Sequence, residues 1–179
     1  IESGFKIKTK FKMFGKNYNT INDGAAMSNA IGKVFENLPR ILKREKPDII
    51  LSGFDIAANF ALSVCGAHMN IPVAHIQGGE VSGTIDESLR HAITKFSHIH
   101  FTANSETKKR LIKMGEVPKN IYSVGCPSID ALISENLISK KKILTKFKID
   151  ISKPYVLVIQ HPVTTELDQS KKQITETIK

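Results

Sequence analysis

The amino-acid sequence predicts an α/β protein in which helices cover an open, mostly parallel sheet. Short apolar runs alternate with helical stretches from residue 48 to residue 133, and the connections between them are short. This rhythm is typical of βαβ units, whose consecutive strands run parallel. The hydrophobic share of 41% over 179 residues is ordinary for a globular protein.

The first expected elements are an edge strand and a long helix. Apolar and basic side chains alternate in residues 5–13, FKIKTKFKM, as in a half-exposed edge strand. A helical pattern then runs from Asp23, the expected N-cap, to Lys46, and Pro39 is expected to kink or divide it. Its apolar positions are Ile31, Val34, Phe35, Leu38, Ile41 and Leu42.

Four strands and four helices are expected to follow in alternation. The strands fall at residues 48–52, 72–76, 98–102 and 120–125. The helices begin at Asp55, at Thr84, at Asn104 or Ser105, and at Pro127. Thr84 with Glu87 three residues later has the pattern of a capping box, and Gly115 closes the third of these helices.

The rhythm is interrupted by a lysine-rich stretch. We predict that residues 1–135 form a first domain, incomplete at its start, and that residues 136–153 are a connection. Residues 154–179 then begin a second α/β domain, with a strand at 155–160 and a helix from Asp168 or Ser170. A segment this short lies below the ~40 residues of a self-sufficient domain, so the chain is expected to be part of a longer protein.

Composition argues against several classes of protein. No apolar run approaches the ~18 residues that span a bilayer, and the charged N-terminal stretch lacks the apolar core of a secretory signal. Cys65 and Cys126 stand apart from any CxxC pattern, which argues against a disulfide framework or a structural zinc site. We expect a cytoplasmic protein that does not associate with membranes.

The net charge of +9 comes from 22 lysines and only four arginines. A positive chain suits a polyanionic partner, yet these lysines are scattered. Their one cluster falls in a polar helical segment and is read as a solvated face: Lys140, Lys141, Lys142, Lys146 and Lys148. With no tryptophan and few arginines, nucleic-acid binding is not expected.

Residues 75–92, HIQGGEVSGTIDESLRHA, carry most of the candidate chemistry. Gly78 and Gly79 permit a sharp turn at the carboxyl end of a strand, where parallel sheets bind ligands. The amides that open the next helix favour an anion. Asp86 and Arg90 lie one turn apart beside this loop. A plain loop and an ordinary helix salt bridge are the alternative readings.

Three further histidines are weaker candidates. His98 and His100 share one face of a strand, but no further ligands stand at metal-binding spacing, so polar lining is favoured. His161 follows the strand at 155–160 and is expected to face a cleft between the two domains. The residues by themselves thus indicate a polar crevice suited to an anionic ligand.

Four motifs, KPDIIL, MNIPVAHIQGGEVSGTIDESLRHAITKFSHIHF, VGCPSIDAL and QHPVTTE, closely resemble the hydrolysing UDP-N-acetylglucosamine 2-epimerases, over about residues 45–168. The resemblance implies two Rossmann-like domains in a GT-B architecture, roughly twice this length, with the site in the cleft. It implies elimination of UDP across C1–C2 of the sugar and hydration of the 2-acetamidoglucal, for nonulosonic acid and surface polysaccharide synthesis. A UDP-sugar is the implied partner, without cofactor or metal, in a homo-oligomer.

The resemblance also implies which residues form the site. GTIDESLRHA carries the Asp and Arg of the helix, and QHP carries a His expected near the diphosphate. The implied catalytic residues are Asp55, Gln77, Asp86 and His161. The implied substrate-binding residues are His75, Gly79, Glu80 and Arg90.

Two departures from the family pattern bear on activity. The family usually has Gly-Asp-Arg where this chain has Phe54-Asp55-Ile56, and HIEGGE where it has HIQGGE. Gln77 therefore replaces a carboxylate implicated in catalysis, and an amide cannot act as a base. Either Glu80, Asp86 or Asp55 carries the proton transfer, or the substrate differs, or activity is lost. We expect a working enzyme with an altered substrate preference.

Three alternatives stay open beside the hydrolysing epimerase. One is a non-hydrolysing epimerase, which returns UDP-N-acetylmannosamine, and another is a different GT-B enzyme such as a glycosyltransferase. The third is a non-catalytic protein that binds a nucleotide sugar. The stretches HIQGGEVSGTIDES and QHPVTT favour the hydrolysing branch.

Overall fold

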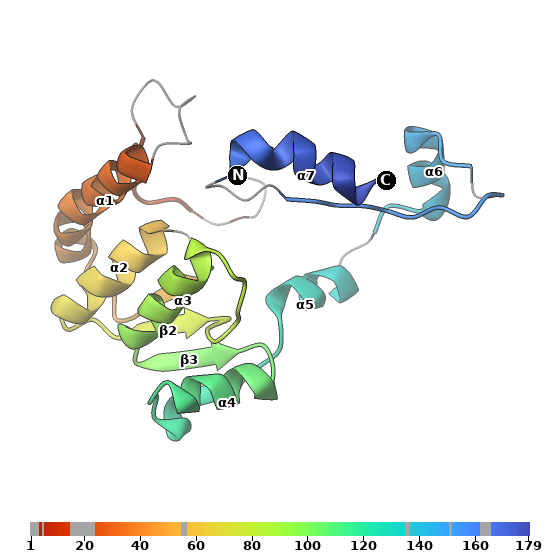
Figure 1. The fold of residues 1–179 in the computed structure, drawn as a ribbon. Coiled ribbons are helices and arrows are strands. Elements are labelled where there is room, and N and C mark those ends of the chain that lie inside the picture. The colour runs from red at the N-terminus through yellow and green to blue at the C-terminus, as the bar shows by residue number, and fades with distance from the viewer. Residues whose placement is uncertain are drawn as a thin grey trace. The chain divides into compact units, whose positions relative to one another are not determined.

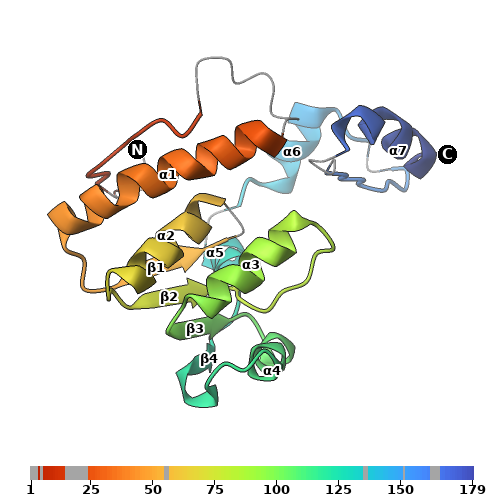
Figure 2. The same ribbon diagram turned by 60° about the vertical axis from the view of Figure 1, so that its left-hand side comes forward.

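The computed structural model describes residues 4, 6–14, 24–54, 57–134, 137–150, 152–161 and 166–179. The chain forms two compact units, Ile1–Gly125 and Cys126–Lys179. The first unit holds the sheet and the helices packed on it, as Figures 1 and 2 show in two orientations. The second unit consists of helices joined by extended segments.

Four parallel strands form the sheet of the first unit. They are β1 (Ile50–Gly53), β2 (Val73–Ile76), β3 (Ile99–Thr102) and β4 (Ile121–Ser123), and they lie in the order β1-β2-β3-β4. Ser52 pairs with His75, His75 with His100, and His100 with Ile121. The carboxyl ends of all four strands therefore lie along one edge. The sequence prediction of a parallel sheet with four strands in this region is confirmed.

The helices of the first unit are α1 (Gly24–Glu45), α2 (Ala57–His68), α3 (Ile85–Lys95) and α4 (Ser105–Lys113), and the 3-10 turn η1 (Pro118–Asn120) precedes β4. Each strand pairs with the next one in the chain, so right-handed crossovers place α2, α3 and α4 on the same face of the sheet. Figures 1 and 2 both show α2 and α3 side by side.

The main core lies between α1, α2 and the first two strands. Val34, Leu38 and Leu42 stand one turn apart on α1 and are buried against Ile50 and Val73. Ala61 and Cys65 of α2 complete this cluster. The helical spacing read from the sequence thus identifies the buried face of α1 correctly.

Pro39 does not divide the first helix, contrary to one of the two expectations. It lies inside α1, which continues to Glu45. A proline removes one backbone donor from the helix interior. The buried side chains Leu38 and Leu42 hold the helix on both sides of it, so packing outweighs the lost hydrogen bond.

The expected N-terminal edge strand is not found in the described residues 6–13. This segment is tied to the end of α1, because the Thr9 hydroxyl donates to Glu45 Oε1 and Arg44 donates to Thr9 Oγ1. Alternation of apolar and basic residues is a pattern that an extended segment outside a sheet also satisfies. Here side-chain bonds to a helix take the place of a ladder.

The first strand is also less buried than the sequence predicts. Ile50 and Ser52 point to the helices, whereas Leu51 is 61% exposed. The helices between the paired strands cover only one face, so every second side chain of β1 lacks a cover among the described residues. An apolar run by itself does not distinguish these two situations.

The second unit contains α5 (Pro127–Ser134), α6 (Lys140–Phe147), the turn η2 (Leu167–Gln169) and α7 (Ser170–Thr177). The predicted helices at 127–133 and from Ser170 are confirmed. The predicted strand at 155–160 has no ladder partner in the described part of the chain, and Val156 is 86% exposed. None of the helices described in either unit has the length and apolar character to cross a membrane.

Candidate functional site

The loop after β2 depends on its two glycines. A Cβ atom at Gly78 would lie 2.8 Å from His75 Nδ1, and one at Gly79 would lie 2.8 Å from the backbone oxygen of Thr107. Gly79 also has a φ of +87°, in the left-handed region that favours glycine. The predicted sharp turn is therefore present. Its close neighbours are β2 and α3 on one side and α4 on the other.

Gln77 opens this loop in an unusual conformation. Its N–H donates to the backbone oxygen of Phe101 at 2.8 Å, which continues the contact between β2 and β3 by one residue. Its φ of 59° lies in the left-handed region, which is uncommon for a residue other than glycine. Backbone outliers of this kind are concentrated at functional sites, because the surrounding structure must hold them in place.

His75 lies beneath the loop rather than at its surface. Its side chain is fully buried, and Nδ1 is 3.1 Å from Thr94 Oγ1. The Thr94 hydroxyl already donates to the backbone oxygen of Arg90, so His75 Nδ1 is the donor in their contact. The structure thus shows His75 supporting Gly78 from below, and its role in lining a sugar pocket stays a prediction.

Arg90 reaches from α3 back to the loop. Nη1 donates to the backbone oxygen of Glu80 at 2.6 Å, and the residue is only 6% exposed. Asp86, one turn earlier, is half-buried and accepts a hydrogen bond from Thr84 Oγ1 at 3.4 Å. The guanidinium therefore contributes to the shape of the loop itself, whatever it also offers to a ligand.

The start of α3 is capped in a different way from the predicted capping box. Thr84 occupies the N-cap position, but its side chain makes no capping hydrogen bond. Glu87 instead reaches further back, and Oε2 accepts from the N–H groups of Ser82 at 2.7 Å and Gly83 at 2.8 Å. These backbone donors, Gly83 foremost, hold the pKa of Glu87 below its ordinary value. The carboxylate is thereby fixed in the loop.

Six of the eight predicted site residues lie on β2, the loop after it and α3: His75, Gln77, Gly79, Glu80, Asp86 and Arg90. The neighbouring strand ends at the same edge, because Gly53 of β1 pairs with Ile76 of β2. Asp55 lies outside the described residues. His161 is exposed and belongs to the second unit.

Arg110 of α4 is a contributor that the sequence did not reveal. Nη1 donates to the backbone oxygen of Gly79, across 31 residues of sequence. Its pattern on the helix suggests only an ion pair with Glu106, which is also present at 3.3 Å. Only the parallel order of β2, β3 and β4 brings α4 beside the loop.

The two strand histidines belong to a separate polar cluster. His98 Nδ1 accepts from the N–H of Val73 at 3.1 Å, whereas His100 Nε2 lies 3.3 Å from Glu116 Oε2. Burial lowers the pKa of His100 despite this carboxylate. Glu116 also pairs with Lys95 at 2.6 Å. No group of three or more potential metal ligands gathers here or elsewhere in the described parts of the chain.

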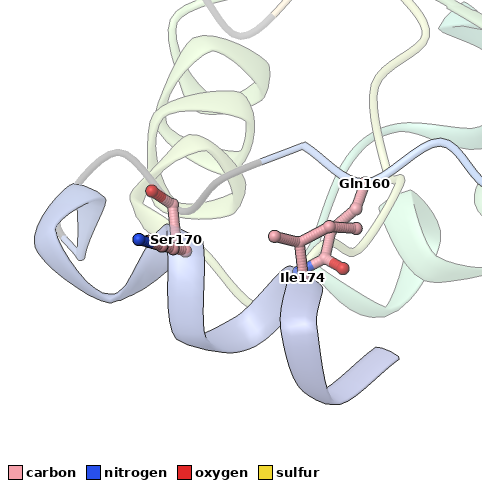
Figure 3. A pocket seen from close by; sticks show the side chains of 4 residues that line it. Gln160, Ser170 and Ile174 are labelled. Carbon is pink, nitrogen blue, oxygen red and sulfur yellow. The ribbon is translucent and has the colours of Figure 1, made fainter. Parts of the chain in front are cut away.

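The second unit contains a pocket of about 390 Å³, lined by Gln160, Ser170, Lys171 and Ile174. Ser170 and Ile174 come from α7, and Gln160 comes from the extended segment before it (Figure 3). The hydroxyl of Thr177 donates to Gln160 Oε1 at 2.8 Å and ties the two together. None of the predicted site residues lines this pocket.

The fold of the chain is similar to that of solved UDP-GlcNAc 2-epimerases. It resembles a UDP-GlcNAc 2-epimerase from Neisseria meningitidis bound to UDP-GlcNAc, with a TM-score of 0.58 and 24% identity over 68% of this chain and 33% of that one. It also resembles a Methanocaldococcus jannaschii UDP-GlcNAc 2-epimerase in complex with UDP-GlcNAc and UDP. The TM-score is 0.59 and the identity is 22%, over 74% of this chain and 35% of that one. The predicted Rossmann-like α/β fold class is confirmed.

The family model for UDP-N-acetylglucosamine 2-epimerase matches residues 2–179, and the chain belongs to this family. It is 38% identical to a hydrolysing UDP-N,N'-diacetylbacillosamine 2-epimerase of Legionella pneumophila, over 86% of this chain and 41% of that protein. A hydrolysing GDP/UDP-N,N'-diacetylbacillosamine 2-epimerase of Campylobacter jejuni is 32% identical over 100% of this chain and 46% of that protein. A UDP-N-acetylglucosamine 2-epimerase of Neisseria meningitidis is 36% identical over 80% of this chain and 38% of that protein. The chain spans less than half the length of these relatives.

Proposed function

We propose that the protein is a hydrolysing 2-epimerase that converts a UDP-2-acetamido sugar to UDP and the free manno-configured sugar. The reaction passes through a 2-acetamidoglucal and supplies nonulosonic acid and surface polysaccharide synthesis. The observation that carries this proposal is the loop and helix at residues 75–90, which hold Gln77, Glu80 and Asp86 at the carboxyl edge of the sheet.

The favoured substrate is the UDP-2,4-diacetamido-trideoxy sugar, with UDP-N-acetylglucosamine as the second candidate. Two relatives at 38% and 32% identity are both named for diacetylbacillosamine substrates and for hydrolysis. The relative named for UDP-N-acetylglucosamine, which is 36% identical in sequence, supports the second candidate. The departures at Gln77 and Ile56 from the usual motifs are in line with a substrate other than the commonest one.

The chemistry needs a base for the C2 proton, stabilisation of the departing UDP, and acid-base groups for hydration. Glu80, Asp86 and Asp55 are the carboxylates that can exchange protons, whereas Gln77 can only hydrogen-bond to the sugar. His161 is the proposed partner of the diphosphate. Arg90 and Gly79 act on the sugar side through the loop that they shape.

The proposed organisation follows from the sequence pattern. Residues 1–135 form the sugar-side domain, 136–153 the connection, and 154–179 the beginning of the uridine-side domain. The enzyme is a homo-oligomer of the cytoplasm, in keeping with the free thiols of Cys65 and Cys126.

Proton NMR of the full-length protein in D2O tests the proposal, with each UDP-sugar supplied in turn. Free manno-configured sugar deuterated at C2, together with UDP, is the expected result. An epimerised sugar still attached to UDP would instead establish the non-hydrolysing reaction. Saturable binding without any product would establish a nucleotide-sugar binding protein.

A further inference from the structure

Two arginines from different helices hold consecutive carbonyl groups of the site loop. Arg90 of α3 donates to the oxygen of Glu80 at 2.6 Å, and Arg110 of α4 donates to the oxygen of Gly79. Two guanidinium groups therefore donate hydrogen bonds to adjacent peptide groups of the loop. Charge-assisted hydrogen bonds of this kind are stronger than those between neutral groups.

The loop lies within reach of Arg110 because Gly79 packs directly on α4. A Cβ at this position would lie 2.8 Å from the oxygen of Thr107 and 3.3 Å from two side-chain carbons of Leu111. The backbone at Gln77 and Gly79 is left-handed, with φ of 59° and 87°. A non-glycine residue such as Gln77 adopts that conformation at a cost, so neighbouring contacts must hold the loop against relaxation.

The other interaction of Arg110 does not account for its position. Its pair with Glu106 joins side chains that are 29% and 81% exposed, one turn apart on the same helix. Exposed pairs of this kind contribute little, because water screens them and both side chains lose freedom. The bond to Gly79 is the contact through which Arg110 affects another part of the fold.

The geometry points to Arg110 as a positioning residue for the 2-epimerase reaction, an inference that rests on the proposed function. Together with Arg90 it fixes the two peptide groups on either side of the Glu80 Cα, because the Gly79 carbonyl precedes that atom and the Glu80 carbonyl follows it. The side chains of Gln77 and Glu80 are carried by this backbone, so their placement against the sugar depends on the two arginines. Arg110 itself touches no reacting atom.

The test compares the full-length protein with its Arg110→Met and Arg110→Lys variants. Misplacing reactive groups by about 1 Å can cost about 100-fold in rate, so we expect kcat of Arg110→Met to fall by up to about 100-fold. KM for the UDP-sugar is expected to stay within about threefold, because Arg110 does not touch it. Arg110→Lys keeps a cationic donor and is expected to recover about tenfold of the lost kcat.

Two variants serve as matched controls. Glu106→Gln removes the exposed ion pair but leaves the bond to Gly79, and Arg40→Met removes an equal charge from α1. Both are expected to keep the kcat of the unmodified protein. Arg40 is exposed, and its side chain donates to Asn37 Oδ1 on the same helix at 3.3 Å.

Hydrogen exchange of residues 75–84, followed by mass spectrometry without substrate, gives an independent readout. Arg110→Met is expected to speed exchange in this peptide at least about tenfold, with the β1 peptide unchanged. Unchanged exchange and unchanged kcat in both Arg110 variants would overturn the inference. If the unmodified protein releases no UDP, the proposed function fails, and the exchange comparison alone decides whether Arg110 holds the loop. If Arg110→Met does not fold, Arg110→Lys is compared with the unmodified protein for hydrogen exchange of residues 75–84 and for kcat.

Discussion

Gly79 combines two constraints that are usually met separately. Its φ of +87° disfavours any side chain, and the space that a Cβ would need is taken by the backbone oxygen of Thr107 at 2.8 Å. We therefore expect Gly79→Ala to lower the free energy of unfolding by about 2–4 kcal/mol, since strain and overpacking add. Denaturant unfolding of the two proteins measures the difference.

Gly83 provides the matched comparison for this prediction. It also has a positive φ, +68°, but nothing lies within 4 Å of the place of its Cβ. Gly83→Ala is expected to cost only about 1–2 kcal/mol, the price of a left-handed alanine. Equal losses in the two variants would show that the close approach to α4 does not matter.

Gln77 is the residue at which the chain departs most clearly from the family motif. We expect Gln77→Glu to reduce kcat on the best substrate by about tenfold, equivalent to about 1.4 kcal/mol in activation free energy. The added carboxylate lies in the loop that carries Glu80, and neighbouring like charges disfavour each other's ionised forms. Steady-state release of UDP measures the effect, and a large gain in kcat would show instead that Gln77 impairs the site.

The residues also show what the sequence could and could not reveal about the site. The spacing of Gly79, Asp86 and Arg90 indicated a turn followed by a helix, whereas the site roles of His75, Gln77 and Glu80 were implied by the resemblance to the family motifs. Arg110 was missed because its contact with Gly79 spans 31 residues. A partner of that kind follows from strand order, which no local pattern encodes.

The element that governs the approach to this loop is α3. Its first turn depends on Glu87, whose carboxylate accepts from the N–H groups of Ser82 and Gly83. These donors lower the pKa of Glu87 in the folded protein. A carboxyl group with a lowered folded-state pKa contributes stability that is fully present above its ordinary value of about 4.3 and is lost as the pH falls through the lower folded value.

Glu87→Gln tests this account of the helix start. The neutral amide can still accept a hydrogen bond but lacks the charge, so we expect the variant to be less stable at pH 7. The difference from the unmodified protein is expected to shrink as the pH falls below about 4.3. Urea unfolding midpoints at pH 7 and pH 3 measure it, and a gap that stays constant across this range would contradict the role of the charge.

In the first unit, the predicted strands that the structure confirms are those that pair with a neighbouring strand, and the predicted first helix is confirmed with its buried face. The strands β1 to β4 each pair with the next strand in the chain, and α1 packs through Val34, Leu38 and Leu42. Residues 6–13 and 155–160 have equally strand-like patterns but no ladder in the described chain. Alternating or apolar composition shows that a segment can extend, whereas a strand also requires a neighbour to pair with.

At the scale of the whole molecule, a ligand that binds only the folded protein adds to its stability. We expect the UDP-2,4-diacetamido sugar, at about 100 times its Kd, to raise the free energy of unfolding of the full-length protein by about 2.7 kcal/mol. Thermal unfolding with increasing ligand measures the effect. A similar shift with UDP alone would place most of the binding on the uridine side, and no shift with any UDP-sugar would contradict the proposed substrate class.

The carboxylate of Glu87 has one more consequence for the whole molecule. The amides of Ser82 and Gly83 already bind an anion, and that anion is tethered to the chain four and five residues away. A tethered group competes with free solutes at an effective concentration that reaches the millimolar range or above. The Glu87 carboxylate therefore competes effectively against a phosphate from solution for these two N–H groups. Under the proposed function, the diphosphate of the UDP-sugar is therefore not expected to bind at the amides of Ser82 and Gly83, because the Glu87 carboxylate already accepts from both.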